Sequence, residues 1–116
     1  MKVYGFVIGQ DGAVMEIKNS LKEEQRFVEG LIECVSLTDE LDLICNDEGK
    51  LLGLQPTVAW LENGELVEII MGNCFVCRYT EDGDFCSIKE SDVAVITEKL
   101  KEIALILNGV VYLRHR

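Results

Sequence analysis

Apolar residues recur at every second position in several short stretches of this chain, which is typical of β-strands with one buried face. The clearest stretch places Leu41, Leu43 and Cys45 on one face and Asp42 on the other. The polar segment 46–49 (Asn-Asp-Glu-Gly) follows, in which the Asn and Asp side chains can bond their own backbone and the glycine permits a positive φ. The pattern predicts a strand, then a turn, then a second apolar run.

Other segments rich in β-branched and aromatic residues also predict strands. They span residues 2–8, 13–17, 31–37, 57–61 and 66–80. Turn residues at 9–12 and 38–40 join neighbouring strands into hairpins, and Asn63-Gly64 is the strongest short hairpin signal in the chain. We therefore expect a mainly antiparallel sheet.

The longest of these segments, residues 66–80, has apolar side chains at nearly all its odd positions, while Glu68 and Arg78 are even. We expect the odd-numbered face to meet the core. Gly72-Asn73 interrupts the run, either as a bulge in one bent strand or as a tight turn between two strands. Of the two, the bulge is our prediction.

A first helix is predicted by capping residues between the early strands. Ser20 and Glu23 have the spacing of a capping box, in which each side chain satisfies a backbone donor at the helix start. Gly30 is expected to end the helix in the left-handed conformation. The expected inner stripe consists of Leu21, Phe27 and Val28.

A second helix is predicted near the end of the chain, with Ser91 or Asp92 as its cap. Its core-facing stripe consists of Val93, Ile96, Leu100, Ile103 and Leu107. This stripe favours a helix up to Asn108-Gly109, followed by a short strand at 110–113. A competing interpretation makes Asn108-Gly109 the turn of a hairpin between residues 104–107 and 110–113.

The order strand, strand, helix, strands, helix predicts an α+β fold with a mainly antiparallel sheet and two helices. The 116 residues, 48% of them apolar, suit a single domain over residues 1–116 with a core of its own. No apolar stretch approaches the roughly 20 residues of a membrane span, and the N-terminus shows no cleavable leader. We expect a soluble, cytoplasmic protein without membrane association.

Residues suited to catalysis or metal binding are sparse. Cys74 and Cys77 have zinc-knuckle spacing, but residues three apart in a strand point to opposite faces, and tetrahedral zinc needs two further ligands. The five cysteines are odd in number and lie in apolar segments, so we expect reduced core thiols. His115 is the only histidine, which leaves no usual general base for a nucleophile. Carboxylate catalysis stays open, but we expect no metal, no cofactor and no enzymatic activity.

The net charge of −10 is unevenly placed. Residues 38–92 carry thirteen acidic groups against three basic ones, whereas residues 93–116 carry two acidic groups against four basic ones. Nucleic acid is disfavoured as a direct ligand, because phosphate contacts require clustered Lys and Arg. The acidic turn residues expected to meet a basic partner are Asp47, Glu48, Asp82 and Asp84. Charge also keeps proteins soluble whatever their function, so acidity alone identifies no partner.

Segment 42–51 (Asp-Leu-Ile-Cys-Asn-Asp-Glu-Gly-Lys-Leu), followed by Leu-Gln-Pro at 54–56, resembles the signature of an uncharacterised family, domain-of-unknown-function family 3846. Compatible segments elsewhere are 27–33, 69–72, 84–85 and 91–92. The family tends to continue as Leu-Pro-x-Asn-Arg, whereas this chain reads Leu-Gln-Pro-Thr-Val at 54–58. The resemblance implies an origin in phages, conjugative elements or gut bacteria, and no known activity.

Two classes of function remain. The first is a non-catalytic protein-interaction module of phage or mobile-element type, which would bind a basic host or element-encoded protein, for example in an anti-defence role. The second is a small-molecule- or nucleotide-sensing accessory domain. A deep pocket lined by Trp60, Phe75 and Tyr79 would favour the second class, whereas a flat acidic face would favour the first. The sequence leaves the oligomeric state open.

Overall fold

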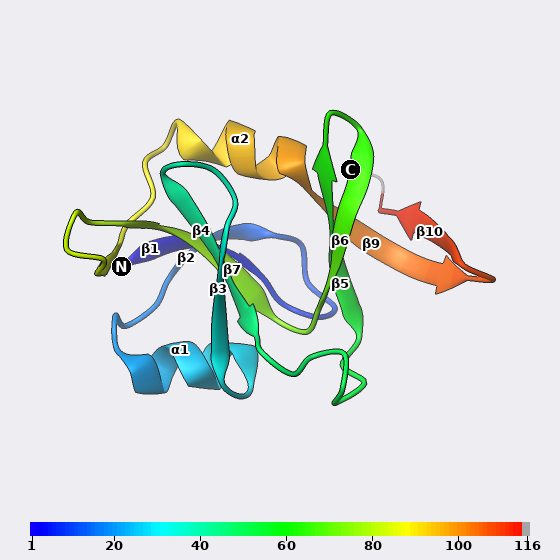
Figure 1. Cartoon of the computed structure of the whole chain (residues 1–116), viewed down its shortest axis with the longest axis horizontal. Coiled ribbons are helices and arrows are strands. Elements are labelled where there is room, and N and C mark those ends of the chain that lie inside the picture. Colours follow the sequence, from blue (N-terminus) through cyan, green and yellow to red (C-terminus); the bar gives the residue numbers. More distant parts are fainter. Residues whose placement is uncertain (115–116) are drawn as a thin grey trace.

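Ten strands and two helices form residues 1–114, the part of the chain that the computed structural model describes (Figure 1). The first half comprises β1 (Lys2–Phe6), β2 (Ala13–Glu16), α1 (Leu21–Val28), β3 (Ile32–Ser36), β4 (Leu41–Asn46) and β5 (Pro56–Glu62). The second half comprises β6 (Glu65–Met71), β7 (Cys74–Tyr79), β8 (Phe85–Cys86), α2 (Asp92–Lys99), β9 (Leu100–Leu107) and β10 (Val110–Leu113). His115 lies outside the described residues.

The strands form two sheets. The six-stranded sheet has the order β2-β1-β7-β4-β3, with β8 also paired to β7, and the four-stranded sheet has the order β10-β9-β5-β6. Every strand pair among the described residues is antiparallel. The predicted α+β class, with a mainly antiparallel sheet and two helices, is confirmed.

The six-stranded sheet is covered on both faces, so its central strands alternate between two hydrophobic clusters. On β7, Phe75 and Cys77 pack in the cluster beneath α1, whereas Cys74 and Val76 pack in the cluster shared with the four-stranded sheet and α2. All four side chains are fully buried. Figure 1 accordingly shows α1 and α2 on opposite sides of this sheet.

Helix α1 begins as predicted, because the Ser20 hydroxyl accepts a hydrogen bond from the Glu23 backbone N–H (3.3 Å). The reciprocal half of the capping box is not formed, since the Ser20 N–H donates to the Lys18 carbonyl instead (2.9 Å). The end of the helix also differs from the prediction. Glu29, not Gly30, adopts the left-handed conformation, with a φ of 63°.

The buried side of α1 differs from the predicted stripe. Leu21 is 57% exposed, whereas Glu24 is only 4% exposed and lies on the same side as Phe27 and Val28. Residues 24, 27 and 28 share one helical face because they follow the three- and four-residue spacing. Both helices span eight residues, and within the described chain neither has the length and apolar character needed to cross a membrane.

Helix α2 is shorter than predicted, because the chain turns into β9 at Leu100. This residue has an extended backbone (φ −113°, ψ 109°) and pairs with Trp60 of β5. Asn108 (φ 51°) and Gly109 (φ 76°) form the turn between β9 and β10, which confirms the competing hairpin interpretation. The predicted helix is too long because the apolar spacing does not distinguish a helix from a strand here. Leu100 and Ile103 are buried in the strand, as they would be in a helix.

Gly72-Asn73 is neither a bulge nor a hairpin turn, because it carries the chain from β6 in one sheet to β7 in the other. Gly72 has a φ of 83°, donates its N–H to the Gln55 carbonyl (2.7 Å) and accepts from the Thr57 hydroxyl (2.6 Å). The change of sheet also breaks the predicted odd-numbered inner face, since the even-numbered Ile70 is buried. The predicted bulge in one bent strand is therefore wrong.

Candidate functional site

A groove lies between the end of β4 in the six-stranded sheet and β6 in the four-stranded sheet. It has a volume of about 300 Å³. Its walls come from β3, β4, β5 and β6, and from the segment that follows β4. The charged residues that line it are Glu33, Asp47, Glu48, Lys50 and Glu68. The apolar residues that line it are Val35, Cys45, Leu51, Trp60, Val67, Ile69, Ile70 and Met71.

Strand β6 presents its edge to this groove rather than one of its faces. Five consecutive residues, Val67 to Met71, line the groove, whereas a face would contribute only every second residue. In the described chain β6 is the terminal strand of its sheet. The outward N–H and C=O groups of such an edge are a template on which another strand can pair.

Lys50 and Glu68 close this edge. The Lys50 ammonium, from the segment after β4, forms an ion pair with the Glu68 carboxylate of β6. The same carboxylate accepts a hydrogen bond from the Ile69 backbone N–H (3.2 Å). Hydrogen bonding by Lys50 lowers the pKa of Glu68. Because both side chains are largely exposed, the pair contributes little stability and can open to an incoming charged group.

The charge around the groove is predominantly negative. Four acidic side chains surround it against one basic side chain, and Glu68 already pairs with that base. Glu33 approaches from β3, and Asp47 and Glu48 from the turn after β4. The groove therefore combines an apolar floor, a strand edge and a rim that favours cations.

The acidic turn after β4 is held on two sides. Asn46 is buried, donates to the Val28 carbonyl of α1 (3.0 Å) and accepts from the Glu48 N–H (2.8 Å). Gly49 packs against β6, where a Cβ atom would lie 2.9 Å from the Met71 carbonyl oxygen. Glycine is needed here for space rather than for the positive φ that the sequence suggested. The turn is thus fixed in place before any ligand binds.

The four acids predicted to meet a partner are divided between two places. Asp47 and Glu48 line the groove, whereas Asp82 and Asp84 lie in the exposed turn between β7 and β8. That turn projects at the left end of Figure 1, while β6 lies to the right of the centre. The structure instead combines the first pair with acids from β3 and β6. Sequence spacing gave no sign of those acids, because they come from strands of different sheets.

The three aromatic residues expected in a deep pocket occupy separate environments. Trp60 lines the groove and donates its Nε1–H to Glu62 (2.9 Å). Phe75 is fully buried beneath α1, edge-on to Phe27 with ring centroids 5.3 Å apart. Tyr79 is 38% exposed near the β3–β4 turn. No pocket shared by these three rings is formed in the described chain.

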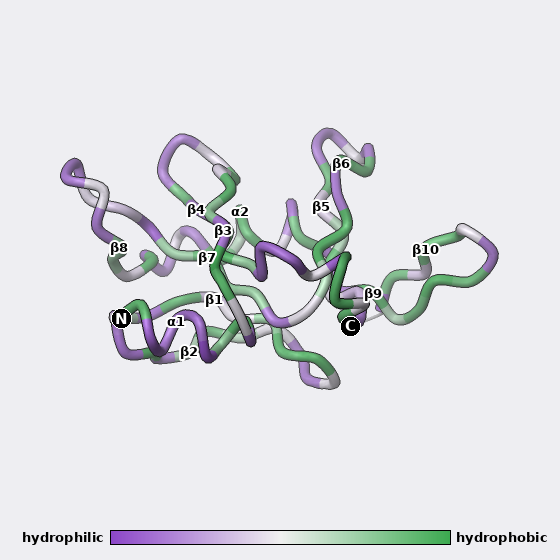
Figure 2. Tube along the Cα trace, turned by 60° about the horizontal axis from the view of Figure 1, so that its bottom comes forward, coloured by the Kyte–Doolittle hydropathy of each residue, from purple (hydrophilic) through white to green (hydrophobic). Residues whose placement is uncertain are grey.

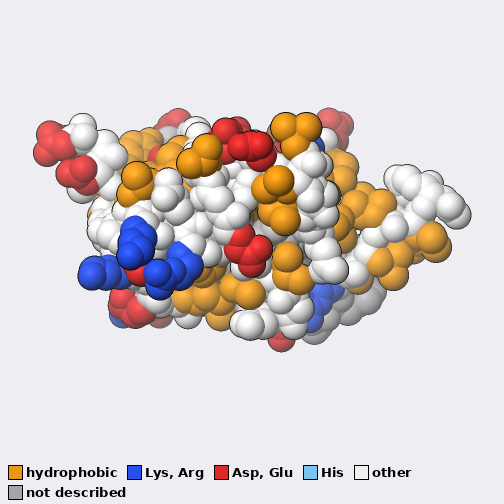
Figure 3. All heavy atoms as spheres, turned by 90° about the horizontal axis from the view of Figure 1, so that it is seen from below, with side chains coloured by type: hydrophobic (Ala, Val, Ile, Leu, Met, Phe, Trp, Pro, Cys, Tyr) orange, Lys and Arg blue, Asp and Glu red, His pale blue; other side chains and the backbone are white. Residues whose placement is uncertain are grey.

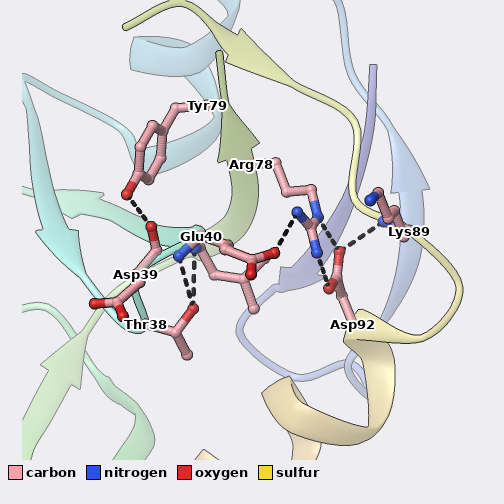
Figure 4. Close-up of polar contacts among 8 residues, drawn as sticks. Thr38, Asp39, Glu40, Arg78, Tyr79, Lys89 and Asp92 are labelled. Atoms are coloured by element: carbon pink, nitrogen blue, oxygen red, sulfur yellow. Dashed lines mark hydrogen bonds and ion pairs between the residues drawn. The ribbon is translucent and has the colours of Figure 1, made fainter. Parts of the chain in front are cut away.

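A second polar cluster ties the six-stranded sheet to α2 (Figure 4). Arg78 on β7 donates from Nε and Nη2 to the two carboxylate oxygens of Asp92 (2.6 and 2.7 Å) and from Nη1 to Glu40 (2.7 Å). Asp92 also accepts the Lys89 backbone N–H (2.7 Å). Hydrogen bonding by Arg78 lowers the pKa of Asp92. Since Asp92 is only 5% exposed and its oxygens are fully engaged, this cluster is a structural link.

The cysteines are dispersed over the described chain. Cys74 and Cys77 lie on opposite faces of the six-stranded sheet, as strand alternation predicts. Burial raises the pKa of Cys45 to about 12. Cys34 is exposed, so the expectation that all five thiols lie in the core is wrong. Among residues 1–114 no group of three or more His, Cys, Asp or Glu side chains is arranged to hold a metal ion.

Comparisons with known proteins give one match. The sequence model of a family described as "Domain of unknown function (DUF3846)" matches residues 1–101. No curated protein and no solved structure matches the chain. The match agrees with the resemblance carried by segment 42–51. It includes every groove residue, whereas most of β9 and all of β10 lie beyond it.

Proposed function

The chain belongs to the DUF3846 family, and because that family has no assigned activity, we propose a function from the groove. The protein is a non-catalytic interaction module that binds a basic, extended segment of a partner protein. The observation that supports this most strongly is the edge of β6 lying inside an acid-rimmed groove.

Binding proceeds by strand addition. An extended peptide pairs its backbone with the outward groups of Val67 to Met71 and thereby adds a strand to the four-stranded sheet. Alternate side chains of the peptide then point to opposite sides. One set meets the apolar floor that includes Trp60 and Ile70, and the other meets the solvent and the rim.

Charge selects the partner. A Lys or Arg side chain of the peptide replaces Lys50 beside Glu68 and meets Asp47 and Glu48 across the groove. A peptide carbonyl that pairs with the Ile69 N–H takes the place of the Glu68 carboxylate at that donor. A basic segment is therefore recognised by both its backbone and its charge.

A basic host or element-encoded protein is the kind of partner that this recognition suits. In a phage or mobile element, occupying a basic segment of a host defence protein would block that segment's contact with nucleic acid. The support for this anti-defence role is the acidic rim together with the origin that the family resemblance implies.

The proposal is tested with a fluorescent peptide of alternating Lys and Val, and with a Glu-Val peptide as control. Two double variants remove the same charge: Asp47→Asn with Glu48→Gln at the groove, and Asp82→Asn with Asp84→Asn at the β7–β8 turn. We expect the groove variant to weaken Lys-Val binding by about 5- to 10-fold at low salt, mainly in the on-rate. The distal variant should change it less than about 2-fold, since its charges lie in a separate exposed turn and do not line the groove.

Backbone resonances give a second measurement. The Lys-Val peptide should shift the amide signals of Val67 to Met71 and leave those of the β7–β8 turn unchanged. Equal weakening of peptide binding by both double variants would show that binding depends only on the net charge of the chain. Undetectable Lys-Val binding, or binding without shifts in β6, would contradict the proposal.

Small-molecule sensing is the second candidate, and the position of Trp60 in the groove favours it. A volume of about 300 Å³ lies at the lower limit for small-ligand pockets. The acidic rim suits a small cation and repels the phosphates of a nucleotide.

A further inference from the structure

Strands β9 and β10 extend past the core as a two-stranded arm, defined here as residues 104–113. Leu100 and Ile103 of β9 are 2% and 8% exposed, whereas every β9 residue from Ala104 to Leu107 is exposed. Within the described chain β10 pairs only with β9. Figure 1 shows the arm projecting to the right, away from both helices.

The arm presents one continuous apolar face. The register pairs Val110 with Leu107 and Tyr112 with Leu105, so these four side chains lie on the same side of the two strands. Their exposed fractions are 51%, 56%, 48% and 50% respectively. Figure 2 shows the hydrophobic colour along most of both strands. A two-stranded hairpin is marginally stable alone in water, so we expect this apolar face to pack against another protein surface.

The arm is held in a fixed direction at its base. Arg114 donates to the Asp11 carboxylate (2.7 Å) and to the Gln10 carbonyl (3.1 Å) in the β1–β2 turn. Its backbone N–H donates to the Glu102 carbonyl (2.9 Å). These bonds from the base of the arm to the body limit its swing, which lowers the entropic cost of docking it.

The arm is also free of negative charge, unlike the chain as a whole. Residues 103–114 contain no Asp or Glu, although the net charge is −10. In Figure 3 the projecting arm carries hydrophobic side chains and no acidic ones. Two copies of this chain, each with a net charge of −10, repel one another, and the arm offers a contact that adds no acidic side chain.

We propose that the arm is a self-association surface, where the face of Leu105, Leu107, Val110 and Tyr112 packs against the same face of a second copy. The two copies are related by a two-fold axis, so each contributes the same patch to the contact. Such an assembly ends at two copies. The two hairpins then stack face to face, as the sheets of a sandwich do.

The exposed apolar area of the arm limits the affinity of this dimer. Four side chains, each about half exposed, offer about 400 Å² per copy and about 800 Å² over two copies, which is small for a specific interface. The dimer is therefore weak and forms in a concentration-dependent manner.

Salt distinguishes this contact from the proposed groove complex. Screening reduces the repulsion between two copies that each carry −10, so self-association strengthens as salt rises. Binding of a basic segment in the groove weakens under the same change. The dimer does not rest on the groove, and either proposal can fail while the other stands.

The test is sedimentation equilibrium of the full chain between about 1 and 500 μM, at low and high salt, a range that spans weak dimers. Leu107→Ser removes the most exposed apolar side chain of the face, and Leu31→Ser is the matched control, because Leu31 is 59% exposed on the α1–β3 connection. We expect Leu107→Ser to raise the dimer Kd at least about 10-fold, because it removes one of only four apolar side chains from a small interface. Leu31→Ser should change it by less than about 2-fold.

Val110→Ser, on the other strand of the same face, should repeat the effect of Leu107→Ser. Circular dichroism checks that all three variants stay folded. A wild-type chain that remains monomeric at the highest concentration would overturn the proposal. Evidence that a different protein covers the arm would overturn it as well. A dimer that survives both arm variants unchanged would overturn it equally.

Discussion

The two sheets of this protein differ in how far their side chains are covered. The six-stranded sheet has a helix on one face and the other sheet on the opposite face, and its central strands β4 and β7 are almost wholly buried. The four-stranded sheet is buried only where β5, Ile70 of β6 and the start of β9 meet that core. In the described chain no further strand pairs with the outer edge of β6, and the arm of β9 and β10 is exposed.

Because of this difference in burial, we expect the two sheets to have separate roles. Burial of apolar surface on both faces makes the six-stranded sheet the main source of stability. The four-stranded sheet shares that core along one side and offers an edge and an apolar face on the other. A rigid body that carries exposed surfaces is the arrangement that the proposed interaction role requires.

The largest difference should appear when a leucine is replaced by alanine at each of the two ends of β9. Leu100 is 2% exposed and Leu107 is 56% exposed. We expect Leu100→Ala to lower the free energy of unfolding by about 2–5 kcal/mol, because it leaves a cavity in the core. Leu107→Ala should lower it by less than about 0.5 kcal/mol. Urea melts at low protein concentration measure both, and similar losses would mean that β9 is not divided in this way.

A smaller effect should follow from the link between the six-stranded sheet and α2. Asp92→Asn removes the charge that engages Arg78 and should cost about 1–3 kcal/mol at pH 7. The folded-state pKa of Asp92 is lowered, so its contribution is present above the unfolded value of about 3.9 and is lost as the pH falls through the folded value. Wild type and variant should therefore converge in stability towards low pH. A difference that stays constant from pH 7 to pH 2 would show that the charge is not involved.

The smallest effect should be a gain in stability. Glu24 is 4% exposed, and its Oε2 accepts no hydrogen bond within the described chain, so burial raises its pKa. A raised carboxyl pKa costs stability as the pH rises past the ordinary glutamate value, because the folded state resists ionisation. Glu24→Gln should add about 0.5–1.5 kcal/mol at pH 7 and nothing at pH 3. Thermal melts at the two pH values measure this, and a loss of stability at pH 7 would mean that the carboxylate has an essential partner.

Local signals predicted much of the framework. The Leu41–Cys45 strand, the Ser20 cap and the Asn63-Gly64 hairpin all depend on neighbouring residues, and all are present. The division of the strands between two sheets was not predictable in the same way. It depends on pairings such as Trp60 with Leu100, which join distant parts of the chain.

The candidate site was only half predictable for the same reason. Asp47 and Glu48 were recognised because they lie in a turn with its own sequence signature. Glu33 and Glu68 were missed, since β3 and β6 meet only through the packing of the two sheets. The arm was hidden by an apolar spacing that a helix and a buried strand share.

Amide hydrogen exchange at low and high protein concentration tests the division of work between the two sheets most directly. We expect the amides of β4 and β7 to exchange slowest at both concentrations, because they open only when the whole chain unfolds. The amides of β9 and β10 beyond Ile103 should exchange fast in dilute protein and gain protection as the concentration rises. Arm amides that are as protected as β7 in dilute protein, or a β7 that exchanges as fast as the arm, would contradict the account.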